Sequence, residues 1–156
     1  MRAMLKWSML GFGVLFTALQ IVPPPVPPLS QTPSPHAAHL QNVARPAVRA
    51  VLERACKDCH SNETRVPWYG HVAPVSWMLA SDVEAGRKKL NFSDWDSRGP
   101  SPDEMEQICD AVSDGSMPIR VYTLIHRDAG LSRHDVDVIC TWANTLMAQK
   151  TISQSR

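Results

Sequence analysis

The residues best suited to chemistry lie in one short stretch, "RACKDCHSNETRVPWY", which runs from Arg54 to Tyr69. It contains two cysteines, Cys56 and Cys59, and His60 directly follows the second. Three chemistries use two thiols and an imidazole at this spacing: a thiol–disulfide redox pair, half of a zinc site, or covalent attachment of haem c. The rest of the sequence has to discriminate among them.

The two other cysteines argue against zinc. Cys109 and Cys140 lie on separate predicted helices and form no second C-x-x-C pair, so a four-ligand site is not apparent. A thioredoxin-like redox pair needs a βαβ setting, which the sequence does not show. Haem c explains every residue of the motif, because Cys56 and Cys59 lie one helical turn apart and can reach two vinyl groups, while His60 follows as an axial iron ligand. We therefore expect one covalently attached haem c, with its iron.

The sequence leaves two questions open, one about the sixth iron ligand and one about the two remaining cysteines. The sixth iron ligand is predicted to be Met117, which stands in "DGSMPIRVY" after the helix stop at Gly115. His126 in "LIHRDAG" is the main competitor, and it would give a lower potential. Outside the haem motif, Cys109 and Cys140 form either a disulfide or two buried free thiols.

The N-terminus has the pattern of an export signal. Arg2 and Lys6 precede an uncharged apolar run, "WSMLGFGVLFTALQIV". No good cleavage site follows, so residues 1–22 are expected to be an uncleaved signal anchor in preference to a cleaved signal peptide. Sixteen residues span only about 24 Å, so the residues just before Trp7 must help to cross the bilayer. The positive-inside rule then predicts a single-pass inner-membrane protein with its haem domain in the periplasm.

After this segment the composition changes twice. Residues 23–42 are predicted to be a proline-rich linker, with seven of the chain's 13 prolines. Residues 43–148 are predicted to form the haem-binding domain and residues 149–156 a flexible tail. Helical periodicity and caps predict helices that begin at Pro46, Pro74, Ser101 and Ser132. No segment alternates with period two, so the expected fold class is all-α, a small cytochrome c-like helical domain.

Charge composition indicates no nucleic-acid partner. The chain has 16 Lys and Arg against 15 Asp and Glu, without a long basic run. The expected partners are the membrane, through the N-terminal helix, and redox proteins such as membrane oxidoreductases. The oligomeric state is not indicated.

Longer motifs carry a family resemblance. The run "CKDCHSNETRVPWYGHVAPVSWMLASDVEAGRKKLNFSDW", with "MPIRVYTLIHRDAGLS" and "CTWA", resembles the bacterial haem-binding domain family of small, membrane-anchored, cytochrome-like proteins. The resemblance covers residues 43–147 and extends loosely to the anchor ending "LQIVPP". It implies haem attachment at Cys56 and Cys59 and axial ligation by His60. Lys57 and Val66 depart from the family pattern at positions that concern packing near the ring edge.

The function expected from these features is electron transfer by a monohaem c-type cytochrome; the sequence favours a non-enzymatic protein and leaves open whether it is an enzyme. The alternative is a haem-based peroxidase or a gas or redox sensor, in which the sixth coordination position is open or weakly held.

Overall fold

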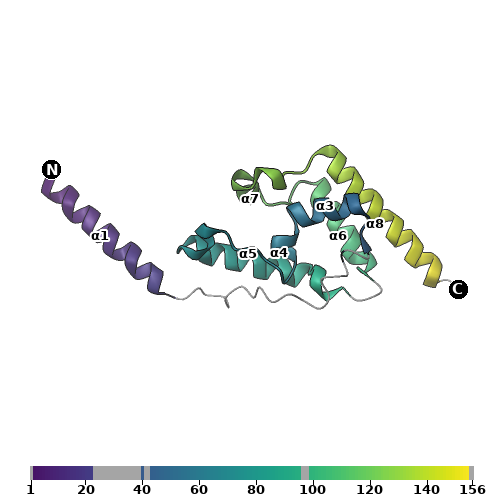
Figure 1. Ribbon diagram of the computed structural model, residues 1–156, viewed down its shortest axis with the longest axis horizontal. Coiled ribbons are helices and arrows are strands. Elements are labelled where there is room, and N and C mark those ends of the chain that lie inside the picture. Colours follow the sequence, from purple (N-terminus) through teal and green to yellow (C-terminus); the bar gives the residue numbers. More distant parts are fainter. Residues whose placement is uncertain (1, 23–39, 41–42, 96–98, 155–156) are drawn as a thin grey trace.

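The computed structural model describes residues 2–22, 40, 43–95 and 99–154, and within these ranges the only regular structure is helical (Figure 1). The predicted all-α class is therefore confirmed. Most of the predicted linker lies outside the described residues. Leu40 is described, and its side chain is buried in the main hydrophobic core.

Helix α1 (Arg2–Ile21) extends away from the rest of the molecule (Figure 1). Its segment Met4–Ile21 is long and apolar enough to cross a membrane, and none of that segment is buried inside the protein. A signal sequence would meet the same criteria. The helix has 20 residues, which corresponds to about 30 Å, so the residues before Trp7 do lengthen the candidate span as the sequence suggested.

Three helices form the main core: α3 (Pro46–Ala55), α6 (Pro102–Ser113) and α8 (Arg133–Gln154). Their apolar stripes meet in a layer whose centre is almost inaccessible to solvent. A disulfide between Cys109 and Cys140 links α6 to α8, which settles the choice between a disulfide and two free thiols. The most buried members of this core are Leu52, Met105, Ile139 and Ala143.

Local features that the sequence predicts set the starts of α6 and α8 and the end of α6. At the start of α6, Ser101 Oγ accepts a hydrogen bond from the Glu104 backbone at 3.2 Å, and the Glu104 carboxylate accepts one from Ser101 N at 2.7 Å. This reciprocal pair is the predicted capping box. Ser132 and Asp135 make the corresponding pair before α8. After α6, Gly115 adopts a positive φ of 73°, which favours glycine and turns the chain out of the helix.

A second group of helices packs beside this core. Helix α4 (Lys57–His60) is a single turn that contacts both α3 and α5 (Val75–Lys89). The 3₁₀ helix η1 (Trp68–His71) lies against α5, and η2 (Phe92–Asp94) lies against α4. Helix α7 (Arg120–Ile125) and η3 (Arg127–Ala129) join α6 to α8.

The 3₁₀ helices η1, η2 and η3 and the six-residue α7 lack the length for a periodic sequence signal and were not predicted, whereas α5 is the helix predicted to begin at Pro74. The end of α8 also differs from expectation. Because this helix continues to Gln154, the boundary expected at residue 149 between domain and tail falls inside it.

Candidate functional site

The C-x-x-C-H motif forms one tight helical turn. Cys56 ends α3, and its carbonyl oxygen accepts hydrogen bonds from the backbone N–H of Cys59 at 3.2 Å and of His60 at 2.9 Å. The two cysteines are free thiols and both are partly buried. The predicted geometry of the motif, with two thiols one turn apart and an imidazole beside them, is therefore present.

The side chain of His60 is oriented by a backbone carbonyl. Its Nδ1 lies 3.0 Å from the carbonyl oxygen of Leu90, just after α5. A carbonyl oxygen can only accept a hydrogen bond, so Nδ1 carries the proton and Nε2 keeps its lone pair. Burial lowers the pKa of His60 below its usual value. Burial outweighs the hydrogen bonds to the backbone of Leu90 and Gly86, which act in the opposite direction on the pKa, so the neutral imidazole that a metal ion requires is favoured.

Burial acts in the opposite direction on the two thiols. It raises the pKa of Cys56 to about 12 and that of Cys59 to about 11. The carboxylates of Asp58 and Asp82 further raise the pKa of Cys59. Thiols of redox-exchange sites have lowered pKa values, because the thiolate is the attacking species. The surroundings of Cys56 and Cys59 therefore disfavour a thiol–disulfide exchange site.

Two adjoining cavities lie beside this turn, with volumes of about 300 Å³ and 180 Å³. Cys56, His60, Lys89 and Met117 line both of them, and Cys59 lines the smaller one. Three of the four predicted site residues thus border both cavities, and all four border the smaller. The remaining lining is largely apolar: Leu52, Phe92, Ile108 and Val112 in the larger cavity, and Ala55, Ala85, Pro118 and Ile119 in the smaller.

Met117 reaches this place through the turn that ends α6. After Gly115 the chain folds back, and the Met117 N–H donates a hydrogen bond to the carbonyl oxygen of Ala111 at 3.0 Å. Ser116 Oγ donates to the same oxygen at 3.2 Å. These bonds fix the loop against the last turns of α6, so the position of Met117 at the cavities is set by its backbone.

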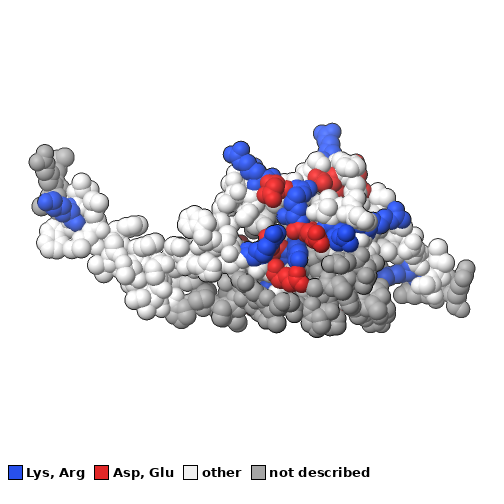
Figure 2. Space-filling view, viewed as in Figure 1, with Lys and Arg blue, Asp and Glu red and all other residues white. Residues whose placement is uncertain are grey.

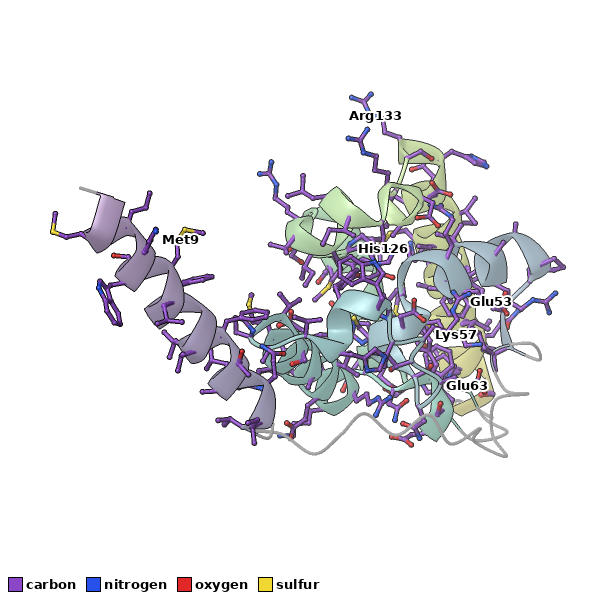
Figure 3. The ribbon with its side chains drawn as sticks, turned by 60° about the vertical axis from the view of Figure 1, so that its left-hand side comes forward. Met9, Glu53, Lys57, Glu63, His126 and Arg133 are labelled. Atoms are coloured by element: carbon purple, nitrogen blue, oxygen red, sulfur yellow. A yellow bond between two sulfur atoms is a disulfide. The ribbon has the colours of Figure 1, made fainter. Side chains whose placement is uncertain are left out.

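His126 lies elsewhere, at the end of α7 (Figure 3). Its Nε2 is hydrogen-bonded to the hydroxyl of Tyr69 at 2.5 Å, and its ring stacks on Tyr122 with centroids 4.3 Å apart. In the part of the chain that the structure describes, the residues that line the two cavities do not include His126. Tyr122 does line the smaller cavity, and its hydroxyl donates to Asp58 Oδ2 at 3.2 Å.

A polar network behind the motif was not predicted. Arg87 of α5 donates to the carbonyl oxygen of Ser61 at 2.8 Å and to the hydroxyl of Thr64 at 2.9 Å. The Thr64 hydroxyl donates in turn to the carbonyl oxygen of Asp58 at 2.6 Å. The run of small polar residues after His60, "SNET", was the available signal, since Ser61 and Thr64 are buried here.

Two further contacts hold the same segment. Asn62 N–H donates to the hydroxyl of Ser93 at 2.9 Å, which ties the chain after His60 to η2. Lys57 and Glu63 form an ion pair of 2.6 Å across the turn (Figure 3). Lys57, which departs from the family pattern, thus supports the motif from outside and does not line either cavity.

Gly86 allows α5 to approach the motif closely. A Cβ atom at this position would lie 2.9 Å from the carbonyl oxygen of Cys59, closer than side-chain atoms are tolerated. The glycine therefore sets the distance between α5 and the turn that carries Cys59 and His60.

A small all-helical protein with a C-x-x-C-H turn beside adjoining apolar cavities belongs to the class of compact haem-binding domains. Residues 14–145 match the family model described as the haem-binding domain. This match covers most of the chain, and the chain belongs to that family. No curated protein and no solved structure shows significant similarity to it. The match begins inside α1, so the end of the apolar helix is part of what the family shares.

The residues present fit a haem. An apolar macrocycle needs apolar walls, and both cavities provide them around Cys56, His60 and Met117. His60 offers a free Nε2 on a fixed ring, and Met117 offers a thioether sulfur from another segment. When bound, the haem supplies an iron that changes its oxidation state by one electron.

Proposed function

We propose that this protein is a membrane-anchored monohaem c-type cytochrome that carries electrons outside the cytoplasmic membrane. Cys56 and Cys59 would hold the haem through thioether bonds, and His60 and Met117 would ligate its iron. The observation that carries the proposal is that these four residues, from two distant segments of the chain, line the same smaller cavity. Haem binding itself is the property of the family to which the chain belongs.

The attachment step is redox-neutral and uses only these thiols. Each S–H would add across one vinyl group, so that a C–S bond forms at one vinyl carbon and the hydrogen is transferred to the other. No oxidant is consumed. The raised pKa values of Cys56 and Cys59 keep both thiols protonated near neutral pH until this step.

Two features support a location outside the cytoplasm. None of the candidate span in α1 is buried inside the protein, as expected for a segment that contacts lipid. The Cys109–Cys140 disulfide is typical of an oxidising compartment such as the periplasm. A single-pass inner-membrane protein with its haem domain in the periplasm accounts for both.

The proposal is tested by expressing the full chain with and without a c-type haem maturation system. Haem that stays with the polypeptide after denaturation is expected only with that system. The Cys56→Ala/Cys59→Ala variant is expected to lose it, whereas His134→Ala, an exposed residue away from the cavities, is expected to keep it. Unchanged covalent haem in the double cysteine variant would refute covalent attachment at this motif.

The second candidate function is ligand binding or peroxide chemistry at the iron. It is favoured by Tyr122, which lines the smaller cavity together with Met117 and whose hydroxyl could donate to a bound ligand only by leaving its hydrogen bond to Asp58. Hydrogen-bond donors near the sixth position decide whether a haem binds small ligands. Carbon monoxide discriminates: rapid, complete binding to the reduced protein supports this function, and slow or absent binding supports the electron carrier.

A further inference from the structure

One end of the haem domain exposes large apolar side chains. Trp68 in η1 is 80% exposed, and Val75 and Met78 in the first turn of α5 are 41% and 58% exposed. Because Val75 and Met78 are three residues apart, they lie on one face of the helix. We call these three residues the apolar end of the domain.

The same end is joined to α1. Gln20, in the last turn of α1, accepts a hydrogen bond from the Ala73 N–H at 3.0 Å and donates one to the Ala73 carbonyl oxygen at 3.2 Å. Ala73 lies between η1 and α5, within the segment that carries the apolar end. The exposed apolar surface of α1 therefore continues directly into the exposed apolar surface of the domain.

The charge distribution agrees with this continuity. On the face shown in Figure 2, the described surface next to α1 has no Lys, Arg, Asp or Glu side chains, whereas these residues gather over the part of the domain farther from it. An uncharged surface that includes an exposed tryptophan is typical of protein that touches the headgroup region of a bilayer.

We propose that the apolar end rests on the outer surface of the same bilayer that α1 crosses. This inference rests on the proposed membrane anchor and goes beyond it, because an anchor alone would allow the domain any orientation. The indole of Trp68 and the side chains of Val75 and Met78 enter the interface between headgroups and acyl chains. The occupant of this surface is lipid, and neither a second copy of the chain nor another protein is required.

The contact sets how the candidate haem site lies relative to the membrane. Helix α5 starts at the apolar end and reaches the candidate haem site at its other end, where Gly86 and Lys89 line the cavities. Gly86 follows Val75 by about three turns, which corresponds to about 16 Å along the helix axis. The haem is thus held at a set distance from the membrane surface, within reach of partners embedded in the same bilayer.

Photo-crosslinking of the full haem-loaded chain in lipid nanodiscs tests the contact. A benzoylphenylalanine is placed at Trp68 or Met78, and at Ile152, which is as exposed as Met78 but lies in the last turns of α8. A fourth position, Phe12 in α1, reports on the anchor. Lipid adducts found by mass spectrometry are expected at positions 68, 78 and 12, with at least fivefold less at 152.

The outcomes separate the contact from the anchor. Lipid adducts at position 12 without any at 68 and 78 would overturn the contact while leaving the anchor intact, and so would adducts to a second copy or another protein. No lipid adduct even at position 12 would overturn both. A second readout is quenching of a headgroup-labelled lipid by the haem, which the Trp68→Ser/Met78→Ser variant should reduce at least twofold and Ile152→Ser should leave unchanged.

Discussion

The Nδ1 of His60 lies 3.0 Å from the carbonyl oxygen of Leu90, so the ring of the candidate iron ligand is held by the backbone at the end of α5. No side-chain substitution elsewhere can remove this acceptor. The arrangement resembles a common device of metal sites, in which the second ring nitrogen of a histidine ligand donates to a carbonyl. Its consequences can be measured before any haem is bound.

The haem-free protein should lose stability in mild acid because of His60. The pKa of His60 is lowered in the folded state, so the unfolded chain takes up a proton at higher pH than the folded one. The free energy of unfolding should therefore be constant above pH 6.5 and fall as the pH decreases, by at most about 1.4 kcal/mol per pH unit for one proton. Denaturant titrations of the wild type and of His60→Asn should show the fall only in the former. An equal loss of stability in the wild type and in His60→Asn would contradict the assignment to His60. The control variant His134→Asn should lose stability as the wild type does.

The two motif thiols should react slowly with alkylating reagents. With pKa values near 12 and 11 against an ordinary value near 9, the thiolate fractions of Cys56 and Cys59 fall by on the order of a thousandfold and a hundredfold. Mass spectrometry of the haem-free protein treated with iodoacetamide at pH 8 should show slow labelling that becomes fast in denaturant, with Cys59 labelled before Cys56. Equal rates in the folded and unfolded protein would show that the thiols are accessible and ionised.

Replacing Met117 should change the iron without releasing the haem. A thioether favours ferrous iron more than an imidazole does, so Met117→His should lower the midpoint potential. Met117→Ala should let carbon monoxide bind rapidly to the reduced protein. His126→Ala should change neither property strongly, because His126 is bonded to Tyr69 and does not line the cavities. If His126→Ala changes both and Met117→Ala changes neither, His126 is the sixth ligand.

Removing the disulfide should weaken the fold and spare haem attachment. The cross-link joins residues 31 positions apart, and closing a loop of that size stabilises a protein by about 3 to 4 kcal/mol. The Cys109→Ser/Cys140→Ser variant should lose about this much in thermal or denaturant unfolding, with its covalent haem retained. Loss of haem from a variant that still folds would instead show that the disulfide shapes the site.

Gly86→Ala should test how closely α5 approaches the motif. In an exposed helix this change would stabilise by about 1 kcal/mol. Here the added Cβ would lie 2.9 Å from the Cys59 carbonyl, and forced packing costs about 1 to 3 kcal/mol. We expect a net loss of about 1 kcal/mol and reduced haem incorporation, whereas Ser81→Ala on the exposed face of α5 should not destabilise. A net gain for Gly86→Ala would mean that α5 can move away freely.

Local sequence signals predicted the parts of this molecule that depend on local physics. The capping-box sequences at Ser101 and Ser132 predicted the starts of α6 and α8, because a helix cap needs only residues three positions apart. The C-x-x-C-H motif was equally readable, since its geometry is one helical turn. Met117 could be proposed because its loop follows the glycine that ends a helix, although its place in the lining of the same cavities as His60 depends on how α6 packs.

The unpredicted parts depend on contacts between distant segments. Arg87 reads in sequence as a basic residue in the last turn of a helix, yet its guanidinium binds the segment after His60. Gly86 has no sequence signal, because only the approach of the Cys59 carbonyl requires it. Helix α7 was also missed, since a six-residue helix is too short to show a period.

The pairing of the four cysteines has a consequence for how the protein is made. Four thiols can form two disulfides in three ways, and any pairing that used Cys56 or Cys59 would consume a thiol that the proposed haem attachment needs. The fold places Cys109 and Cys140 together on α6 and α8, away from the motif turn. In the folded protein, disulfide formation and the proposed haem attachment therefore use different sulfur atoms.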